Sequence, residues 1–274
     1  MASISILHTF INALHILHYN GLLDAYGHLS VRNPDNSSTF FMARGSIAPA
    51  LVCKPLILRV STSQDIVEYL VADASPIDPN APQGVGERFI HSEIYKRFSG
   101  INSVVHSHSS EVIPYTITEV LFRPAIHMAG FLGESVPVFD ISGSYTSNDT
   151  HDFLVTNVRR GAALAAKFSD DSSRLTDLPD HPVVLMQSHG FAGCTTSIES
   201  VVYQAIYTQR NAQVLSSALN LEHAYGGGKD GIVFLTPQEA RESYATISGT
   251  FERPWSLWVR EVEVSPLYKN EVNP

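Results

Sequence analysis

The segment 86–108 constrains the fold most, because it joins a helical pattern directly to a strand pattern. Apolar residues recur at helical spacing through 86–98, and Gly100 marks the end of that helix. The apolar run 103–108 follows at once and has the character of a strand. A helix that leads immediately into a strand is typical of layered α/β structures.

The same mixture of patterns extends along the rest of the chain. Helices are expected at 6–17, 86–98, 109–119, 159–168 and 197–223. Strands are expected at 28–33, 39–43, 56–60, 66–72, 103–108, 136–140 and 181–190, and just before His127. Neither a repeat of fixed period nor a linker interrupts the 274 residues. We therefore expect one α/β domain over 1–274, with a C-terminal tail at about 249–274.

Charge and hydropathy exclude several classes of partner. The formal net charge is −9 and no block of basic residues occurs, which argues against nucleic acid, because phosphates select basic surfaces. No apolar run reaches the roughly 18–20 residues of a membrane span. Polar residues interrupt the apolar N-terminus, which indicates an amphipathic helix rather than a secretion signal. Two cysteines, Cys53 and Cys194, favour a reducing compartment, and we expect the cytoplasm.

His106 and His108 are the first candidate functional residues. Because a strand points residues i and i+2 to the same face, their imidazoles should lie side by side. A catalytic zinc-type site needs a third protein ligand and leaves one position open for water or substrate. His189 is the best candidate, since it directly follows a very apolar strand and precedes Gly190. A His-x-His pair on a strand also occurs without a metal, so the spacing leaves both interpretations open.

Glu87 is the candidate acid or base. A Lewis-acidic metal stabilises a developing oxyanion, but it does not move a proton, so a second group is needed. Glu87 lies in the first turn of the expected helix, between the loop glycines Gly84 and Gly86 and the helix body. A glutamate in a first turn also interacts favourably with the helix dipole, and that purely structural role remains an alternative.

Several motifs in this order resemble the class II aldolase/adducin family. They are Gly27-His28-Leu29-Ser30-x-Arg32, Glu87 with His91 four residues on, His106-Ser107-His108-Ser109, the stretch 121–133 (LFRPAIHMAGFLG), and Ser188-His189-Gly190. The resemblance covers about residues 5–225, which is most of the chain. A set of motifs in one order is far more specific than His-x-His alone.

The resemblance implies a fold, an assembly and a metal site. The family fold is a three-layer α/β/α domain around a mostly antiparallel central sheet, and members usually form C4 homotetramers with active sites at subunit interfaces. In metal-dependent members three histidines hold Zn2+ or another divalent ion, and a glutamate acts as acid or base. Carried onto this sequence, these residues are His106, His108, His189 and Glu87. Zn2+ is the expected ion, with Mn2+, Fe2+ and Co2+ as the other ions that imidazoles accept.

Departures from the sugar-phosphate aldolases point to a different substrate. The small hydroxyl donors that hold a phosphate are largely missing from Ala43-Arg44-Gly45-Ser46 and from Val85-Gly86-Glu87. We therefore expect a non-phosphorylated carboxylate, bound by His28, Arg44 and Ser46, because a guanidinium matches the geometry of a carboxylate. Met128 stands where the aldolases carry a tyrosine, which resembles the decarboxylase branch of the family more closely.

The combined interpretation is a metal-dependent carbon–carbon lyase. We expect decarboxylation of a hydroxy- or keto-carboxylate through a metal-stabilised enolate or phenolate, with Glu87 protonating the carbon. Retro-aldol cleavage, an Fe(II)-dependent oxygenase and a non-catalytic adducin-like scaffold remain alternatives. The tail after Gly249 matches no family pattern, and we expect its aromatic residues to cover a neighbouring active site.

Overall fold

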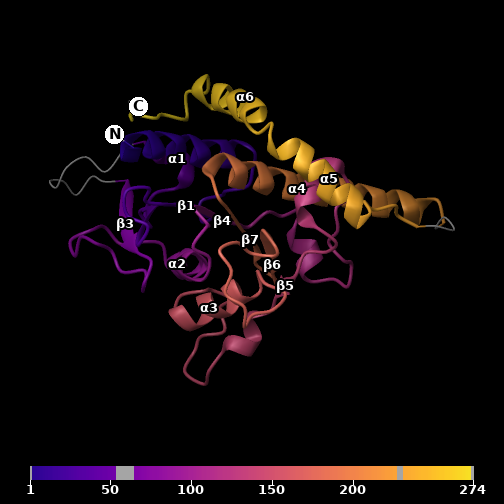
Figure 1. Cartoon of the computed structure of the whole chain (residues 1–274), viewed down its shortest axis with the longest axis horizontal. Helices are drawn as coiled ribbons and strands as arrows, with labels where there is room; N and C mark the ends of the chain where they lie inside the picture. The colour runs from indigo at the N-terminus through magenta and orange to yellow at the C-terminus, as the bar shows by residue number, and fades with distance from the viewer. Residues whose placement is uncertain (1, 54–64, 227–230, 273–274) are drawn as a thin grey trace.

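The computed structural model describes residues 2–53, 65–226 and 231–272 (Figure 1). Its framework is a seven-stranded sheet with the order β3-β2-β1-β4-β7-β6-β5. The strands are β1 (His28–Arg32), β2 (Thr39–Ala43), β3 (Ile66–Leu70), β4 (Ser103–Ser107), β5 (Val138–Phe139), β6 (Val183–Met186) and β7 (Gly190–Thr195). Neighbouring strands are antiparallel except for the parallel pair β5 and β6. The expected α/β class with a mostly antiparallel sheet is confirmed.

Helices cover both faces of this sheet. They are α1 (Ala2–Tyr19), α2 (Arg88–Arg97), α3 (Val158–Ala166), α4 (Ile198–Ala224), α5 (Pro237–Ser248) and α6 (Glu252–Glu263). Helices α1 and α4 lie on one face and α2 and α3 on the other, which gives three layers, and α6 packs outside α1 (Figure 1). Within the described ranges, none of these helices has both the length and the apolar character to cross a membrane.

The side chains of the central strands point alternately to the two faces of the sheet, and each face has its own hydrophobic core. Leu29, Val31 and Val105 pack in the core beneath α1 and α4, whereas Val104 packs in the core beneath α2 and α3. Because successive side chains of a strand point to opposite faces, His106 lies on the α2 side of the sheet. The polar side chains of β1 point to this same side, so the α2 layer is where chemistry can be assembled.

Three expectations for local structure are wrong. Instead of a helix over 109–119, the chain forms only a short 3-10 helix, η2 (Ile113–Thr116), since Pro114 cannot donate a backbone hydrogen bond. Before His127 the chain is irregular, and the 3-10 helix η3 (His127–Leu132) follows. The strand expected at 181–190 ends early: β6 stops at Met186, a turn follows, and the chain returns as β7, whose small residues carry no strand pattern. The strand expected at 56–60 lies outside the described residues.

The C-terminal tail packs against the same chain. Trp258 and Val262 of α6 are buried in the core beside α1. Further along, the Tyr268 hydroxyl lies 2.9 Å from His18 Nδ1, and the Asn270 amide donates to Asn12 Oδ1 at 2.7 Å. Burial of the tail aromatic residues therefore does not require a second chain.

Candidate metal centre and substrate cavity

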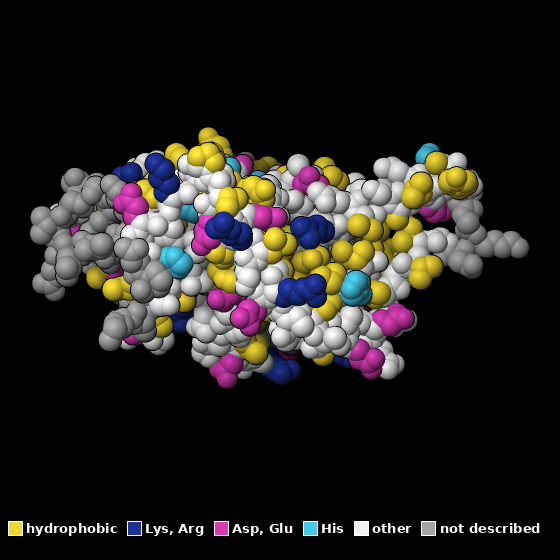
Figure 2. Space-filling view, turned by 90° about the horizontal axis from the view of Figure 1, so that it is seen from above, with side chains coloured by type: hydrophobic (Ala, Val, Ile, Leu, Met, Phe, Trp, Pro, Cys, Tyr) yellow, Lys and Arg dark blue, Asp and Glu magenta, His cyan; other side chains and the backbone are white. Residues whose placement is uncertain are grey.

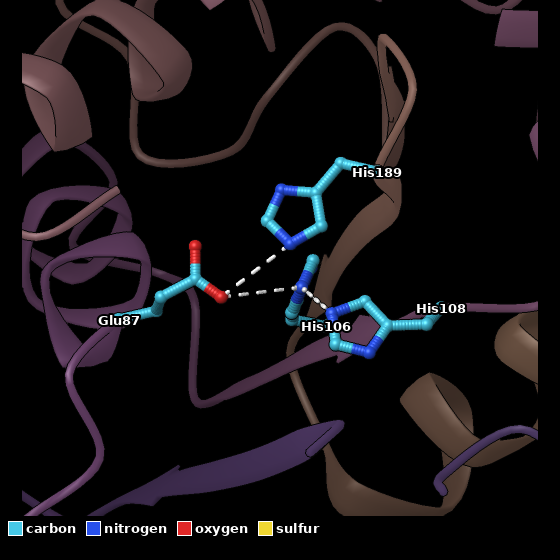
Figure 3. A group of neighbouring side chains, drawn as sticks. All are labelled: Glu87, His106, His108 and His189. Carbon is cyan, nitrogen blue, oxygen red and sulfur yellow. Dashed lines mark hydrogen bonds and ion pairs between the residues drawn. The ribbon is translucent and has the colours of Figure 1, made fainter. Parts of the chain in front are cut away.

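Three imidazoles and one carboxylate converge at the end of β4 (Figure 3). His106 lies in β4, His108 directly follows it, and His189 lies in the turn between β6 and β7. His106 Nε2 and His108 Nε2 are 3.0 Å apart, and the His189 ring centroid lies 4.7 Å from that of His106. With Glu87, the candidate ligand atoms all lie within 4.8 Å of one another. The structure thus brings together the residues that the sequence suggested as one site.

A glycine at the start of β7 allows His189 to reach this point. Gly190 has a φ of +148°, and a Cβ atom there would lie 2.0 Å from the Ser107 carbonyl oxygen. The close approach places the turn before β7 directly beside the end of β4. Ser188, in the same turn, has a φ of +56°, a conformation that non-glycine residues rarely adopt. The strained backbone at Ser188 thus directly precedes His189, the side chain that this turn places beside His106 and His108.

Contacts at the Nδ1 atoms of His106 and His108 leave the Nε2 atoms of both rings available to bind a cation. His106 Nδ1 lies 3.1 Å from the Phe191 carbonyl oxygen, which can only accept, so His106 carries its proton on Nδ1. His108 Nδ1 lies 3.5 Å from Asp24 Oδ1, which favours a proton there too. The Nε2 lone pairs of His106 and His108 then face each other at 3.0 Å and repel each other, and a cation bound between them would remove this repulsion. Burial, with the neighbouring histidines, also lowers the pKa of His106 well below 6.5, which keeps it neutral. These residues fit a divalent metal ion.

Glu87 lies within ion-pair distance of two of the imidazoles. It is the N-cap residue of α2, yet its side chain makes no capping hydrogen bond and points instead toward the histidines (Figure 3). Its Oε2 atom lies 3.7 Å from His106 Nε2 and 3.5 Å from His189 Nε2. Its Oε1 atom accepts a hydrogen bond from the Val155 backbone at 2.8 Å. The side chain therefore does not serve the end of its own helix.

A cavity of 520 Å³ opens beside the cluster. Its walls include the apolar residues Leu14, Ile47, Pro49, Val85 and Leu154 and the polar residues His28, Arg44, Ser46, Glu87 and His108. All three residues expected to bind substrate therefore line one cavity together with Glu87. The Arg44 guanidinium lies 3.6 Å from Asp65 Oδ1, so a buried carboxylate partly balances its charge.

Sequence reasoning missed a buried hydrogen-bonded chain that begins at His28. His28 Nδ1 lies 2.7 Å from His91 Nε2, and His91 Nδ1 lies 2.7 Å from Ser30 Oγ. Ser30 Oγ in turn lies 2.7 Å from the Tyr95 hydroxyl. Burial lowers the pKa of His91 to about 3 and raises that of Tyr95, so both stay neutral. The available signal was spacing: His28 and Ser30 share a strand face, and His91 and Tyr95 share a helix face.

Comparison with known proteins gives one consistent result. The family model "Class II Aldolase and Adducin N-terminal domain" matches residues 8–216. Decarboxylase tropJ of Talaromyces stipitatus is 49% identical over 265 residues, with 96% of each chain covered. The 3,4-dihydroxyphthalate decarboxylase of Arthrobacter keyseri is 27% identical over 224 residues, covering 80% of this chain and 79% of that protein. An aldolase II superfamily protein from Pseudomonas syringae shares the fold, with a TM-score of 0.71 at 16% identity over 97% of this chain and 94% of that one.

Proposed function

The chain belongs to the class II aldolase and adducin family and is an enzyme of the lyase class, and we propose that it is a divalent-metal-dependent decarboxylase. Its substrate would be a non-phosphorylated hydroxy- or keto-carboxylate. One observation carries this proposal: three imidazoles and Glu87 converge beside a largely apolar cavity, which His108, Glu87 and Arg44 line. Similarity to two decarboxylases supports the same reaction.

A hydroxylated aromatic carboxylate suits the cavity best. Apolar walls favour a flat ring, and Arg44 offers a guanidinium for a carboxylate. Ser46 adds a single hydroxyl, whereas a phosphate dianion would call for several donors. The Arthrobacter keyseri relative is named for a substrate of this chemical kind, a dihydroxylated aromatic dicarboxylate.

His106, His108 and His189 would hold the metal, and we favour Zn2+ over Mn2+, Fe2+ and Co2+. A divalent ion there would supply the positive charge that stabilises an enolate or phenolate. Loss of CO2 leaves an electron pair on the substrate carbon. Protonated Glu87 would transfer the Oε2 proton to that carbon and then regain a proton from water. Before CO2 leaves, Arg44 would orient the substrate carboxylate in the cavity.

We also propose a homo-oligomeric assembly, with the tetramer as the expected form. Figure 2 shows hydrophobic side chains gathered between charged ones on the face that α4, α5 and α6 form. The large exposed hydrophobic residues here are Leu221 in α4, Tyr225 directly after α4, Leu257 in α6 and Val264 directly after α6. Exposed apolar area of this kind supports association between chains. The mass of the purified protein, measured by light scattering, tests this assembly.

A decarboxylation assay tests the proposed reaction. Zn2+-loaded protein is incubated under anaerobic conditions with hydroxylated benzoates and phthalates, and released CO2 is measured. The expected result is CO2 with the protonated ring product, and no dependence on oxygen. An aldehyde product would indicate retro-aldol cleavage, and turnover that requires O2 would indicate an oxygenase. Either outcome would contradict the proposal.

A further inference from the structure

The chain of side chains behind the candidate metal centre has a direction. It runs from His28 at the cavity wall through His91 and Ser30 to Tyr95 in the core. Each link contains one hydrogen, and the neutral His91 ring donates through one nitrogen and accepts through the other. Ser30 Oγ could accept in both of its links only if its own buried hydrogen were left unsatisfied, which is costly, so Ser30 donates in one link and accepts in the other. The chain can therefore exist in two forms, which differ in the group that His28 presents to the cavity.

In the first form, every donor points toward the cavity. The Tyr95 hydroxyl donates to Ser30 Oγ, Ser30 donates to His91 Nδ1, and His91 Nε2–H donates to His28 Nδ1. His28 then carries its proton on Nε2. That atom is buried and has no hydrogen-bond partner among the described residues. One donor is left unsatisfied, and it lies in a residue that lines the cavity, where a ligand can accept from it.

In the second form, every donor points toward the core. His28 Nδ1–H donates to His91, His91 to Ser30, and Ser30 to the Tyr95 oxygen. The Tyr95 hydrogen then lacks an acceptor, because within residues 2–53, 65–226 and 231–272 its hydroxyl bonds to Ser30 Oγ, which is donating in this form, and to the backbone N–H of Val104, which can only donate. No ligand in the cavity can reach this hydrogen, since Tyr95 lies in the core and, unlike His28, does not line the cavity. An unsatisfied buried donor is costly, so the first form is favoured.

We propose that His28 is a catalytic hydrogen-bond donor, and that Ser30, His91 and Tyr95 are positioning residues that fix its proton on Nε2. This inference rests on the proposed function. The His28 N–H would donate to a substrate oxygen on which negative charge builds as CO2 leaves. Ring centroids of His28 and His106 are 4.9 Å apart, so the donor lies next to the candidate metal ligands. A neutral N–H suits this place, because a charged imidazolium would repel the metal ion.

The position of the proton can be measured without any substrate. Protein labelled with 15N-histidine and loaded with Zn2+, which is diamagnetic, gives long-range 1H–15N spectra that identify the protonated nitrogen of each ring. Signals of His28 are assigned by their loss in His28→Gln. The expected result is Nε2–H for both His28 and His91. Nδ1–H on His28 would overturn the proposal, whether or not the protein proves to be a decarboxylase.

A matched pair of tyrosine variants tests the role of Tyr95, the residue at the buried end of the hydrogen-bonded chain. Tyr95→Phe removes the terminal donor and leaves room for a water, which can accept from Ser30 and so permits the second form. We therefore expect a mixture of His28 tautomers and a fall in kcat of about tenfold, with KM and zinc content unchanged. Tyr69→Phe is the control, because Tyr69 lies in the same core and its hydroxyl has no hydrogen-bond partner in the part of the chain that the structure describes. It should leave the His28 tautomer and kcat unchanged. Equal kcat and an unchanged tautomer in Tyr95→Phe would refute the positioning role.

A serine series provides a second test. Ser30→Ala breaks the chain in its middle, and Ser30→Thr restores a hydroxyl at the same place. We expect Ser30→Ala to lose about as much kcat as Tyr95→Phe, and Ser30→Thr to recover most of it. Ser103→Ala is the control, since Ser103 is equally buried on the adjacent strand and lies outside the chain. A loss of the same size in Ser103→Ala would mean that a general packing effect is responsible.

Discussion

The backbone N–H of Val155 donates to Glu87 Oε1 at 2.8 Å, and this bond gives the two carboxyl oxygens different surroundings. Oε1 is held by the backbone, while Oε2 faces the Nε2 atoms of His106 and His189. A proton on the carboxyl group therefore belongs on Oε2, because among the described residues Oε1 is the oxygen that accepts a hydrogen bond. This arrangement suits a group that must deliver a proton in one direction.

Replacing Glu87 by its amide should separate metal binding from proton transfer. Glu87→Gln keeps the shape of the side chain but cannot donate a carboxyl proton, so we expect kcat to fall by about 100-fold or more. Zinc content should stay unchanged, as measured by elemental analysis. Glu93→Gln is the control on the same helix, because Glu93 pairs with Lys96 and lies outside the cluster. Retained turnover in Glu87→Gln would remove its assigned role.

Arg160 holds the segment that carries Val155. Its buried guanidinium donates to the Leu154 carbonyl at 2.7 Å and to the Thr150 carbonyl at 3.1 Å. Arg160→Gln should loosen this segment, lower kcat by about tenfold and destabilise the fold by about 2 kcal/mol. Activity assays and thermal unfolding measure both effects.

The neighbouring residue provides the control for this substitution. Arg159 pairs with Asp149, as Arg160 does, but 43% of the Arg159 side chain is exposed. Arg159→Gln should therefore change the stability of the fold very little. If Arg160→Gln lowers stability while kcat stays at the wild-type value, the segment does not position Glu87.

Arg44 should act on substrate binding more than on chemistry. Arg44→Lys keeps the positive charge but loses the paired donors that match a carboxylate, so we expect KM to rise about tenfold with a smaller change in kcat. Steady-state kinetics with one carboxylate substrate measures the split. Arg123→Lys, at a guanidinium that stacks on Phe234 away from the cavity, is the control. An unchanged KM in Arg44→Lys would place the carboxylate elsewhere in the cavity.

Fold and site were predictable to different degrees. Apolar residues that repeat every two positions located the main strands, and those that repeat every three to four positions located the main helices. Each spacing follows the buried face of the element. Strand spacing also placed His106 beside His108. Gly190 correctly pointed to a close backbone approach beside His189. The hairpin itself was missed, since the small residues of β7 carry no strand pattern.

Contacts with backbone groups make up most of the remaining site geometry that could not be predicted from the sequence. The carbonyl of Phe191 and the N–H of Val155 orient His106 and Glu87, yet a backbone group leaves no signal in the identity of its residue. The Ser30–Tyr95 contact joins β1 to α2, and common residue types of this kind become informative only when both elements are placed.

His15 should make stability depend on pH. Burial lowers its pKa from 6.5 to about 4, against the opposing effect of the bond between Nε2 and the Val52 carbonyl. The unfolded chain therefore binds a proton at higher pH than the folded one. The stabilisation is complete above about pH 6.5 and is lost progressively as pH falls toward 4, by at most about 3 kcal/mol.

A variant isolates this contribution. His15→Gln retains a donor for the Val52 carbonyl but does not titrate, so the free energy of unfolding should depend less steeply on pH between 6.5 and 4. Denaturant unfolding at several pH values measures the slope. His223→Gln, at an exposed position near the end of α4, should keep the wild-type slope. Identical slopes in all three proteins would contradict the prediction.

The most direct test of the central claim is the metal content of the purified protein, measured by elemental analysis beside the double variant His106→Ala/His108→Ala. The account predicts about one divalent ion per chain, which the double variant loses. It also predicts that chelation lowers the Tm of the wild-type protein and leaves that of the variant unchanged, because a bound ligand stabilises the folded state. Absence of metal from the wild-type protein, even after incubation with Zn2+, Mn2+, Fe2+ or Co2+, would contradict a metal-dependent lyase.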